Sequence, residues 1–181
     1  MVRVIAGTFK GRTLEAPDWE GLRPTSDKLR ETLFNILAPR IGGARVLDGY
    51  AGTGAIGIEA LSRGAAHVTF IDQDRRAADL IAGNLETCRI AGGYAIIHSS
   101  VLLGVKRLRG EPAFDVILLD PPYASDIHDV LQQLGEIVKP DGVVVLEHAR
   151  KSAPPVAPGR LIRVREVRSG DSALTFYSCQ P

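Results

Sequence analysis

A glycine-rich segment and an acidic residue further along the chain have the types and spacing that suit cofactor binding. Residues 46–57 read VLDGYAGTGAIG, an apolar run followed by the pattern Gly52-x-Gly54-x-x-Gly57. This pattern predicts a strand, a tight turn and a helix, in which the glycines allow a ligand to approach the backbone closely. Asp72 ends the next apolar run and can accept hydrogen bonds from both hydroxyl groups of a ribose. The two features together predict a site for a nucleoside-containing cofactor.

The charge of Asp48 bears on which cofactor the turn accepts. A pyrophosphate is favoured by a helix N-terminus and repelled by a carboxylate, so Asp48 disfavours a dinucleotide such as NAD. The same carboxylate suits the cationic methionine end of S-adenosyl-L-methionine, which we expect as the cofactor. An NAD-dependent oxidoreductase and a turn without a ligand stay open, as does a purely structural role for Ser100. The residues expected to contact the cofactor are Asp48, Gly49, Ala51, Gly52, Gly54, Asp72, Gln73, Ser100 and Val101.

The second candidate for chemistry is the tetrapeptide Asp120-Pro121-Pro122-Tyr123, which directly follows the apolar run 114–119. Two prolines end a strand and fix the backbone in a rigid, extended loop. An exocyclic amine of a base is a poor nucleophile, because its lone pair is delocalised into the ring. The Asp120 carboxylate and the Pro121 carbonyl can accept the amine hydrogens, which stabilises positive charge on the nitrogen. Tyr123 offers a face on which the base can stack, so the tetrapeptide predicts methylation of a base amine, with a chance loop as the alternative.

Basic residues are concentrated in two parts of a chain whose formal net charge is only +1. This charge is low for a protein that binds nucleic acid over a wide area, so phosphate contacts must come from local clusters. The first thirty residues carry one cluster, from which we expect Arg3, Lys10 and Arg12 to bind RNA. The second cluster, residues 150–168, has six basic residues and one acidic residue, Glu166. Ordinary solvated charges are the alternative for both clusters.

Cysteine usage and hydropathy indicate where the protein acts. Cys88 and Cys179 lie far apart, with no histidine at metal-ligand spacing, so we expect neither a disulfide framework nor a metal site. No stretch approaches the roughly 18 apolar residues of a membrane span, and the N-terminus lacks the apolar segment of a signal peptide. We therefore expect a soluble, cytoplasmic protein without a metal, and we expect it to act as a monomer.

Strand-like apolar runs alternate with helical patterns from residue 44 onward, which predicts an α/β fold. The runs 161–167 and 173–178, joined by a turn, predict a closing antiparallel hairpin. We therefore expect a Rossmann-like, mostly parallel seven-stranded sheet with one antiparallel strand at or near its edge. This domain would span residues 44–181, after an appendage (1–43) made of a β-hairpin and a helix that ends before Pro39. The other expected strands are 45–49, 67–72, 94–98, 114–120 and 143–147, and the other expected helices are 55–63, 75–90 and 127–138.

Nearly the whole chain resembles the RsmD family of bacterial enzymes, which methylate the N2 amine of a guanine in 16S ribosomal RNA. The resemblance is carried by residues 3–12 (RVIAGTFKGR), 23–37 (RPTSDKLRETLFNIL), 57–65 (GIEALSRGA) and 120–123 (DPPY). It implies a class I S-adenosylmethionine-dependent methyltransferase that acts on 16S rRNA within the small ribosomal subunit or an assembly intermediate. It also implies that Arg23 and Thr25 lie near the methionine end of the cofactor, and that the N-terminal hairpin engages RNA. A helix-capping role is equally open for Thr25.

A DNA adenine-N6 methyltransferase is the nearest rival, because the same tetrapeptide serves any planar exocyclic amine. Such enzymes usually need a recognition domain that reads base edges, and no segment here is long enough to supply one. A non-catalytic RNA-binding module on the same scaffold is disfavoured by the three intact acids, Asp48, Asp72 and Asp120.

Overall fold

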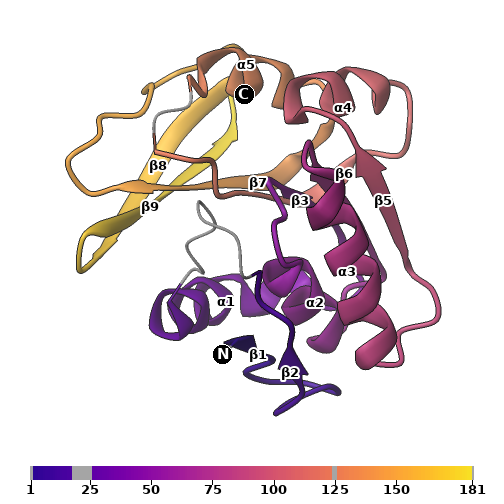
Figure 1. Cartoon of the computed structure of the whole chain (residues 1–181). Coiled ribbons are helices and arrows are strands. Elements are labelled where there is room, and N and C mark those ends of the chain that lie inside the picture. Colours follow the sequence, from indigo (N-terminus) through magenta and orange to yellow (C-terminus); the bar gives the residue numbers. More distant parts are fainter. Residues whose placement is uncertain (1, 18–25, 124–125, 181) are drawn as a thin grey trace.

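The computed structural model describes residues 2–17, 26–123 and 126–180, and a seven-stranded sheet lies at its centre (Figure 1). The strands follow the order β5-β4-β3-β6-β7-β9-β8. Strand β9 runs antiparallel to both β7 and β8, and the other neighbouring pairs are parallel. The prediction of a mostly parallel sheet with one antiparallel strand near its edge is therefore confirmed. The bounds are β3 (Arg45–Gly49), β4 (His67–Asp72), β5 (Tyr94–His98), β6 (Phe114–Leu119), β7 (Val138–Ala149), β8 (Leu161–Ser169) and β9 (Ser172–Cys179).

Helices cover both faces of the sheet (Figure 1). Helices α1, α2 and α3 pack on one face and α4 and α5 on the other, each set forming its own hydrophobic cluster with the strands. Successive residues of β3 enter opposite clusters, Val46 the first and Leu47 the second. Because both faces are covered, these strands are continuous apolar runs, and β3, β4 and β5 have the predicted bounds. The helices are α1 (Asp27–Ile41), α2 (Ala55–Ser62), α3 (Arg75–Thr87), α4 (Val101–Arg107) and α5 (His128–Leu134).

The predicted N-terminal hairpin is present and docks on α2. Strands β1 (Val2–Arg3) and β2 (Thr13–Leu14) pair antiparallel, and their buried side chains join the cluster of α1, α2 and α3. The buried carboxylate of Glu59 accepts hydrogen bonds from the backbone N–H of Ile5 (2.7 Å) and of Ala6 (3.0 Å). At Gly7 (φ +83°), a Cβ would lie 1.9 Å from the carbonyl oxygen of Ser62, so only glycine fits this contact. The hairpin is thus held against the helix that follows the glycine-rich turn, and the division of the chain at residue 44 stays a prediction.

Several predicted element bounds were wrong. Helix α1 continues through Pro39 to Ile41, because the proline lies in the last turn and the buried Ile41 holds the end of the helix against the core. Helix α4 was not predicted, since its seven residues are mostly apolar and include Gly104, so they show no helical period. Helix α5 ends earlier than predicted, and β7 begins at Val138, which pairs with Phe114 of β6. No helix of the described residues has the length and apolar character needed to cross a membrane.

Candidate active site

The two predicted motifs meet at the carboxyl ends of the central strands. Strands β3 and β6 are parallel neighbours, so the turn after β3 and the loop after β6 leave the same edge of the sheet. The backbone N–H of Asp120 lies 3.4 Å from the carbonyl oxygen of Gly49, which joins the tetrapeptide 120–123 to the end of β3. On the other side of β3, the backbone N–H of Gly52 donates to Oδ2 of Asp72 at the end of β4 (2.9 Å). The glycine-rich turn, Asp72 and the tetrapeptide therefore lie together at the carboxyl edge of the sheet.

The glycine-rich turn has the backbone conformations that its sequence predicts. Gly52 (φ +56°) and Gly54 (φ +76°) are left-handed, and Gly54 is the N-cap of α2. Gly57 serves close packing instead, since a Cβ there would lie 2.2 Å from Cε1 of Phe70 in β4. The turn therefore has the left-handed backbone that allows a ligand to approach closely, while α2 packs closely on the sheet, and both features fit a nucleoside cofactor.

Asp72 is held in a fixed orientation that fits the predicted contact with a ribose. Its Oδ2 accepts from Gly52, and its Oδ1 accepts from the backbone N–H of Asp74 (2.9 Å). Each oxygen keeps a further lone pair, and the side chain is half-buried rather than covered. Gln73 is exposed beside it, and its carbonyl oxygen lies 3.0 Å from Nε2 of His98. The ribose contact of Asp72 and the contact of Gln73 with the cofactor stay predictions.

Ser100 has a structural role as the N-cap of α4. Its hydroxyl accepts a hydrogen bond from the backbone N–H of Leu103 (3.3 Å), while Val101 is buried in the cluster of α4 and α5. This N-cap hydrogen bond supports the structural alternative for Ser100. A contact of Ser100 or Val101 with the adenine of the cofactor stays a prediction. Arg23 and Thr25 lie outside the described residues.

Asp48 is a buried acid whose pKa is strongly perturbed. Its side chain is 1% exposed, and its Oδ2 accepts from the backbone N–H of Gly57 (2.9 Å). Burial raises the pKa of Asp48 well above its usual value, and the charges of Asp120 and Asp72 raise it further, against the opposing effect of the Gly57 hydrogen bond. Burial in the free site therefore shifts the equilibrium of Asp48 toward its protonated form, and a cation bound nearby would shift it back toward the ionised form.

This linkage predicts how the protein responds to pH. Folding raises the pKa of Asp48 above the value of 3.8 that it has in the unfolded chain. Between pH 3.8 and the pKa of the folded state, the folded protein therefore binds more protons than the unfolded chain. The contribution of this carboxyl to the free energy of unfolding falls as the pH rises through that range. A cationic cofactor would expel the proton. We expect calorimetry at a series of pH values above 3.8, in buffers of different ionisation enthalpy, to detect proton release on cofactor binding. The release should disappear in Asp48→Asn, which keeps an acceptor for Gly57; equal release by both proteins would contradict this role.

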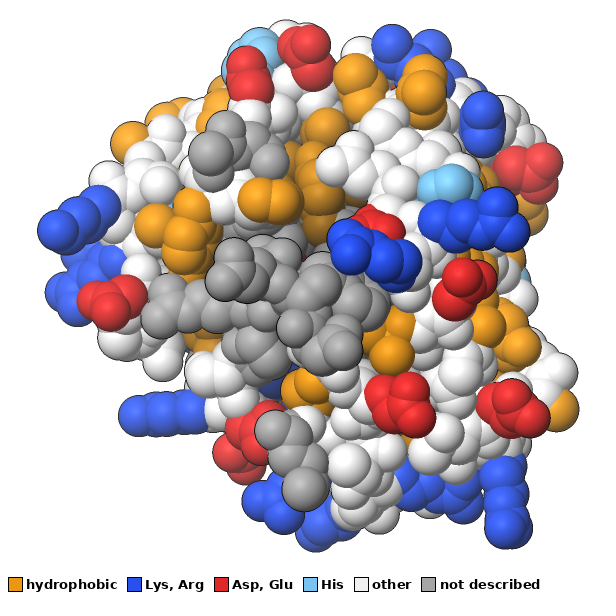
Figure 2. All heavy atoms as spheres, viewed as in Figure 1, with side chains coloured by type: hydrophobic (Ala, Val, Ile, Leu, Met, Phe, Trp, Pro, Cys, Tyr) orange, Lys and Arg blue, Asp and Glu red, His pale blue; other side chains and the backbone are white. Residues whose placement is uncertain are grey.

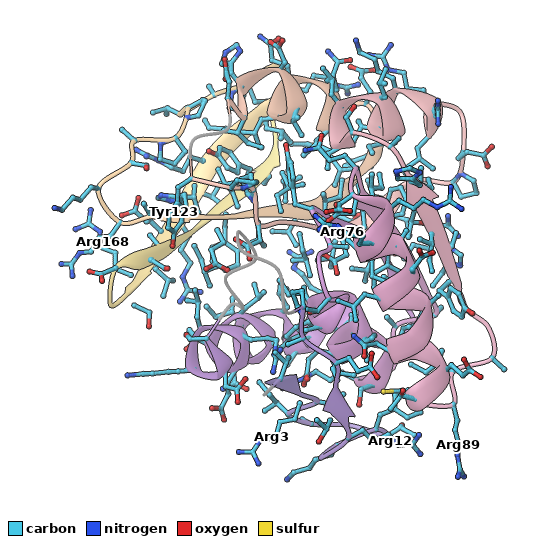
Figure 3. All side chains as sticks on the ribbon, in the orientation of Figure 1. Arg3, Arg12, Arg76, Arg89, Tyr123 and Arg168 are labelled. Atoms are coloured by element: carbon cyan, nitrogen blue, oxygen red, sulfur yellow. The ribbon has the colours of Figure 1, made fainter. Side chains whose placement is uncertain are left out.

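Three residues of the tetrapeptide, Pro121, Pro122 and Tyr123, line a pocket of about 260 Å³. Its other walls come from residues 126–128, from the end of β7, and from residues 152–155. Pro121 is buried, whereas Tyr123 is 54% exposed, and its hydroxyl lies 3.4 Å from Oγ of Ser172 at the start of β9. Figure 3 shows Tyr123 near the β8–β9 hairpin, on the side of the molecule away from α3. An exposed aromatic face beside a pocket gives an unstacked base a place to bind.

The residues predicted to bind RNA surround the N-terminal hairpin. Arg3 and Lys10 are exposed. Arg12 is half-buried, donates through Nη1 to the carbonyl oxygen of Thr87 (3.2 Å), and lies over the ring of Phe9. Arg12 thus also interacts with the C-terminal end of α3, and RNA binding by all three stays a prediction. In the described segments, no group of three or more His, Cys, Asp or Glu side chains could hold a metal ion.

Sequence reasoning missed Asn84, which connects the N-terminal segment to the glycine-rich turn. Its fully buried amide donates through Nδ2 to the carbonyl oxygens of Thr53 (2.9 Å) and Glu15 (3.1 Å), and its Oδ1 accepts from the backbone N–H of Glu15 (2.7 Å). The sequence offered one sign of this role. Asn84 is a polar residue that lies next to Leu85 on the otherwise apolar, buried face of α3. Glu147 and His148, which line the pocket at the end of β7, were also missed.

Comparisons with known proteins agree with this geometry. A family model described as "Conserved hypothetical protein 95" matches residues 2–178. A Haemophilus influenzae relative named ribosomal RNA small subunit methyltransferase D is 37% identical over 180 residues, which cover 97% of this chain and 93% of that protein. An Escherichia coli relative of the same name is 36% identical, with 97% and 89% covered. A solved Escherichia coli structure described as a candidate methyltransferase is 31% identical with a TM-score of 0.86, covering 99% of this chain and 98% of that one.

Proposed function

The chain belongs to the conserved hypothetical protein 95 family, and from this premise we propose that it transfers a methyl group from S-adenosylmethionine to the exocyclic N2 of a guanine in 16S ribosomal RNA. The observation that carries the proposal is the position of the tetrapeptide, with Asp120 joined to the end of β3 beside the glycine-rich turn. The relatives' names support a small-subunit RNA substrate. We propose that the enzyme acts in the cytoplasm, on the subunit or an assembly intermediate, with Arg3, Lys10 and Arg12 contacting RNA.

In the proposed reaction, some residues of the site bind the cofactor and others position the target base. When bound, S-adenosylmethionine supplies an electrophilic methyl group on a sulfonium. Asp72 would hold the ribose, and the backbone of Gly52 and Gly54 would border the cofactor. The Asp120 carboxylate and the Pro121 carbonyl accept the hydrogens of the target amine, which directs its lone pair toward the methyl group and stabilises the growing positive charge. Tyr123 fixes the plane of the base, so that attack occurs in line.

The pocket favours guanine over adenine through Glu147. The Watson–Crick edge of guanine presents donors at N1 and N2, whereas adenine presents an acceptor at N1. Glu147 is buried at the end of β7 and lines the same pocket as Pro121 and Tyr123. A carboxylate oxygen can accept a hydrogen bond from guanine N1–H, whereas adenine N1 has a lone pair and no hydrogen to donate. This contrast supports the guanine substrate and not the alternative, a DNA adenine.

We expect Glu147→Gln to lower kcat/KM for the RNA substrate about 10- to 100-fold, because a hydrogen bond to a charged group is worth about 1.5–3 kcal/mol. Initial rates on undermethylated subunits measure this change. Glu136→Gln, an exposed residue that does not line the pocket, is the matched control and should retain normal activity. Equal activity of Glu147→Gln and the control would assign no role to Glu147 in substrate selection.

The deciding experiment is transfer of a labelled methyl group from S-adenosylmethionine to undermethylated small ribosomal subunits, free 16S rRNA and duplex DNA, followed by nucleoside analysis. We expect N2-methylguanosine from the RNA substrates. Label in N6-methyladenine of DNA would replace the proposed substrate by the alternative. Absence of label from all three would overturn the proposal.

A further inference from the structure

The pocket opens beside a group of basic side chains to which the sequence motifs assign no role. The last residues of β7 and β8 lie beside the first residue of β9, because Ser172 pairs with both Ala149 and Ser169. These three strand ends therefore lie together at the carboxyl end of β7. The backbone N–H of Arg150 donates to the carbonyl oxygen of Asp171 in the β8–β9 turn (2.8 Å), which places Arg150 beside that turn. Because Ser172 is also the residue that approaches the Tyr123 hydroxyl, the turn and its basic neighbours border the mouth of the pocket.

The charge of this region contrasts with that of the whole chain. Residues 150–168 carry six of the 22 basic residues but one acid, Glu166, in a protein whose net charge is +1. Arg150, Lys151 and Arg168 are all exposed. Two acids reduce the charge, Asp171 in the turn and Glu166, which accepts from Nε of Arg168 (2.7 Å). Figure 2 shows Lys and Arg side chains gathered at the left edge, where Figure 1 places the β8–β9 hairpin.

The edge strand β8 carries arginines on both of its faces. A β-bulge between Arg163 and Arg165 makes them the partners of two successive residues of β9, Tyr177 and Phe176, which face opposite clusters. The guanidinium of Arg165 lies 5.8 Å from the centre of the Phe176 ring. Exposed cations and a bulge on an edge strand oppose its pairing with a strand of another protein. The same exposed arginines of β8 would attract a polyanion.

We propose that Arg150, Lys151 and Arg168, which we name the mouth cations, bind phosphates of the RNA strand on either side of the target guanine. This inference rests on the proposed function. A base that leaves its stack to reach Tyr123 brings its flanking phosphates to the mouth of the pocket. Cations there hold the backbone in register without reading the sequence. Their contribution is substrate binding, and the methyl transfer itself stays with the tetrapeptide.

The test is the triple variant Arg150→Gln/Lys151→Gln/Arg168→Gln, assayed on undermethylated small subunits over a range of salt concentrations. We expect KM to rise at least about tenfold, kcat to stay within about twofold, and the slope of log KM against log salt to fall by about two, since each phosphate contact contributes about 0.7–0.9. Lys106→Gln/Arg107→Gln removes two exposed cations of α4 and should change neither KM nor slope.

The outcomes separate this proposal from the proposed function. Wild-type KM and slope in the triple variant would overturn it, and so would a raised KM with an unchanged slope, which would indicate an uncharged or protein contact. If the wild-type enzyme forms no N2-methylguanosine, the proposed function fails. Binding of labelled 16S rRNA fragments to the wild type and the triple variant then still decides the role of the mouth cations, because equal affinity and equal salt slope would exclude it.

Discussion

Asp120→Ala is expected to lower kcat for methyl transfer by about 10²–10⁴-fold, the range seen when a group that stabilises transition-state charge or accepts a proton is removed. The carboxylate sits where the β6 loop meets the end of β3, and no other acid belongs to the tetrapeptide. Since Asp120 contacts the amine and not the cofactor in the proposed arrangement, cofactor affinity should stay within a few-fold of normal. Single-turnover rates and calorimetric Kd values measure the two quantities separately.

The matched control for Asp120 is Asp129→Ala, which removes an exposed carboxylate in the first turn of α5. It should turn over normally. Full activity of Asp120→Ala would exclude the proposed role, and a loss of cofactor affinity as large as the loss of rate would reassign the residue to cofactor binding.

Glu59→Ala is expected to lower the free energy of unfolding by about 3 kcal/mol, the scale for removing one partner of a buried charged network. The fully buried Glu59 carboxylate accepts from Ile5 and Ala6, and its Oε1 also accepts from Nε of Arg63 (2.7 Å). The substitution leaves two backbone N–H groups of the hairpin and one guanidinium without their acceptor. Urea unfolding measures the stability, and hydrogen exchange at Ile5 and Ala6 should show that the hairpin opens first.

Glu86→Ala is the comparison for Glu59, because Glu86 is an exposed acid near the end of α3. It should change stability by less than about 0.5 kcal/mol. If Glu59→Ala destabilises the protein no more than Glu86→Ala does, the hairpin is held mainly by its apolar contacts, through Val2, Val4 and Leu14.

The order of the two motifs made much of the candidate site predictable from the sequence. The residues after a buried parallel strand leave at its carboxyl end, so Asp48, Asp72 and Asp120 were expected at one edge before any contact was known. That geometry depends only on local strand order and is confirmed by the pairing of β3 with β4 and β6. The contacts of these acids with the cofactor and the base were also predicted from the sequence, and they stay predictions.

The pocket wall and the mouth cations were not predicted, because they depend on which strands are neighbours in the sheet and on which of their side chains face the same space. Glu147 and His148 border the tetrapeptide only because β6 and β7 are parallel neighbours. The mouth cations lie on both sides of the start of β9, whose Ser172 approaches Tyr123, because β9 inserts antiparallel between β7 and β8. The sequence showed a basic cluster but not the surface on which it lies.

The sequence by itself determined the fold class, the glycine-rich turn and the rigid loop at the tetrapeptide 120–123, since each follows from local rules: apolar runs, left-handed glycines and prolines that end a strand. Only the tertiary structure decided what Asn84, Glu59 and Glu147 do. Each is a buried polar residue with at least one neighbour that lies far away in the sequence: Glu15 for Asn84, Ile5 for Glu59 and Tyr123 for Glu147. Burial and hydrogen-bond geometry therefore had to be known before a role was visible. Local patterns specify elements, whereas the environment of a buried polar group is a property of the assembled core.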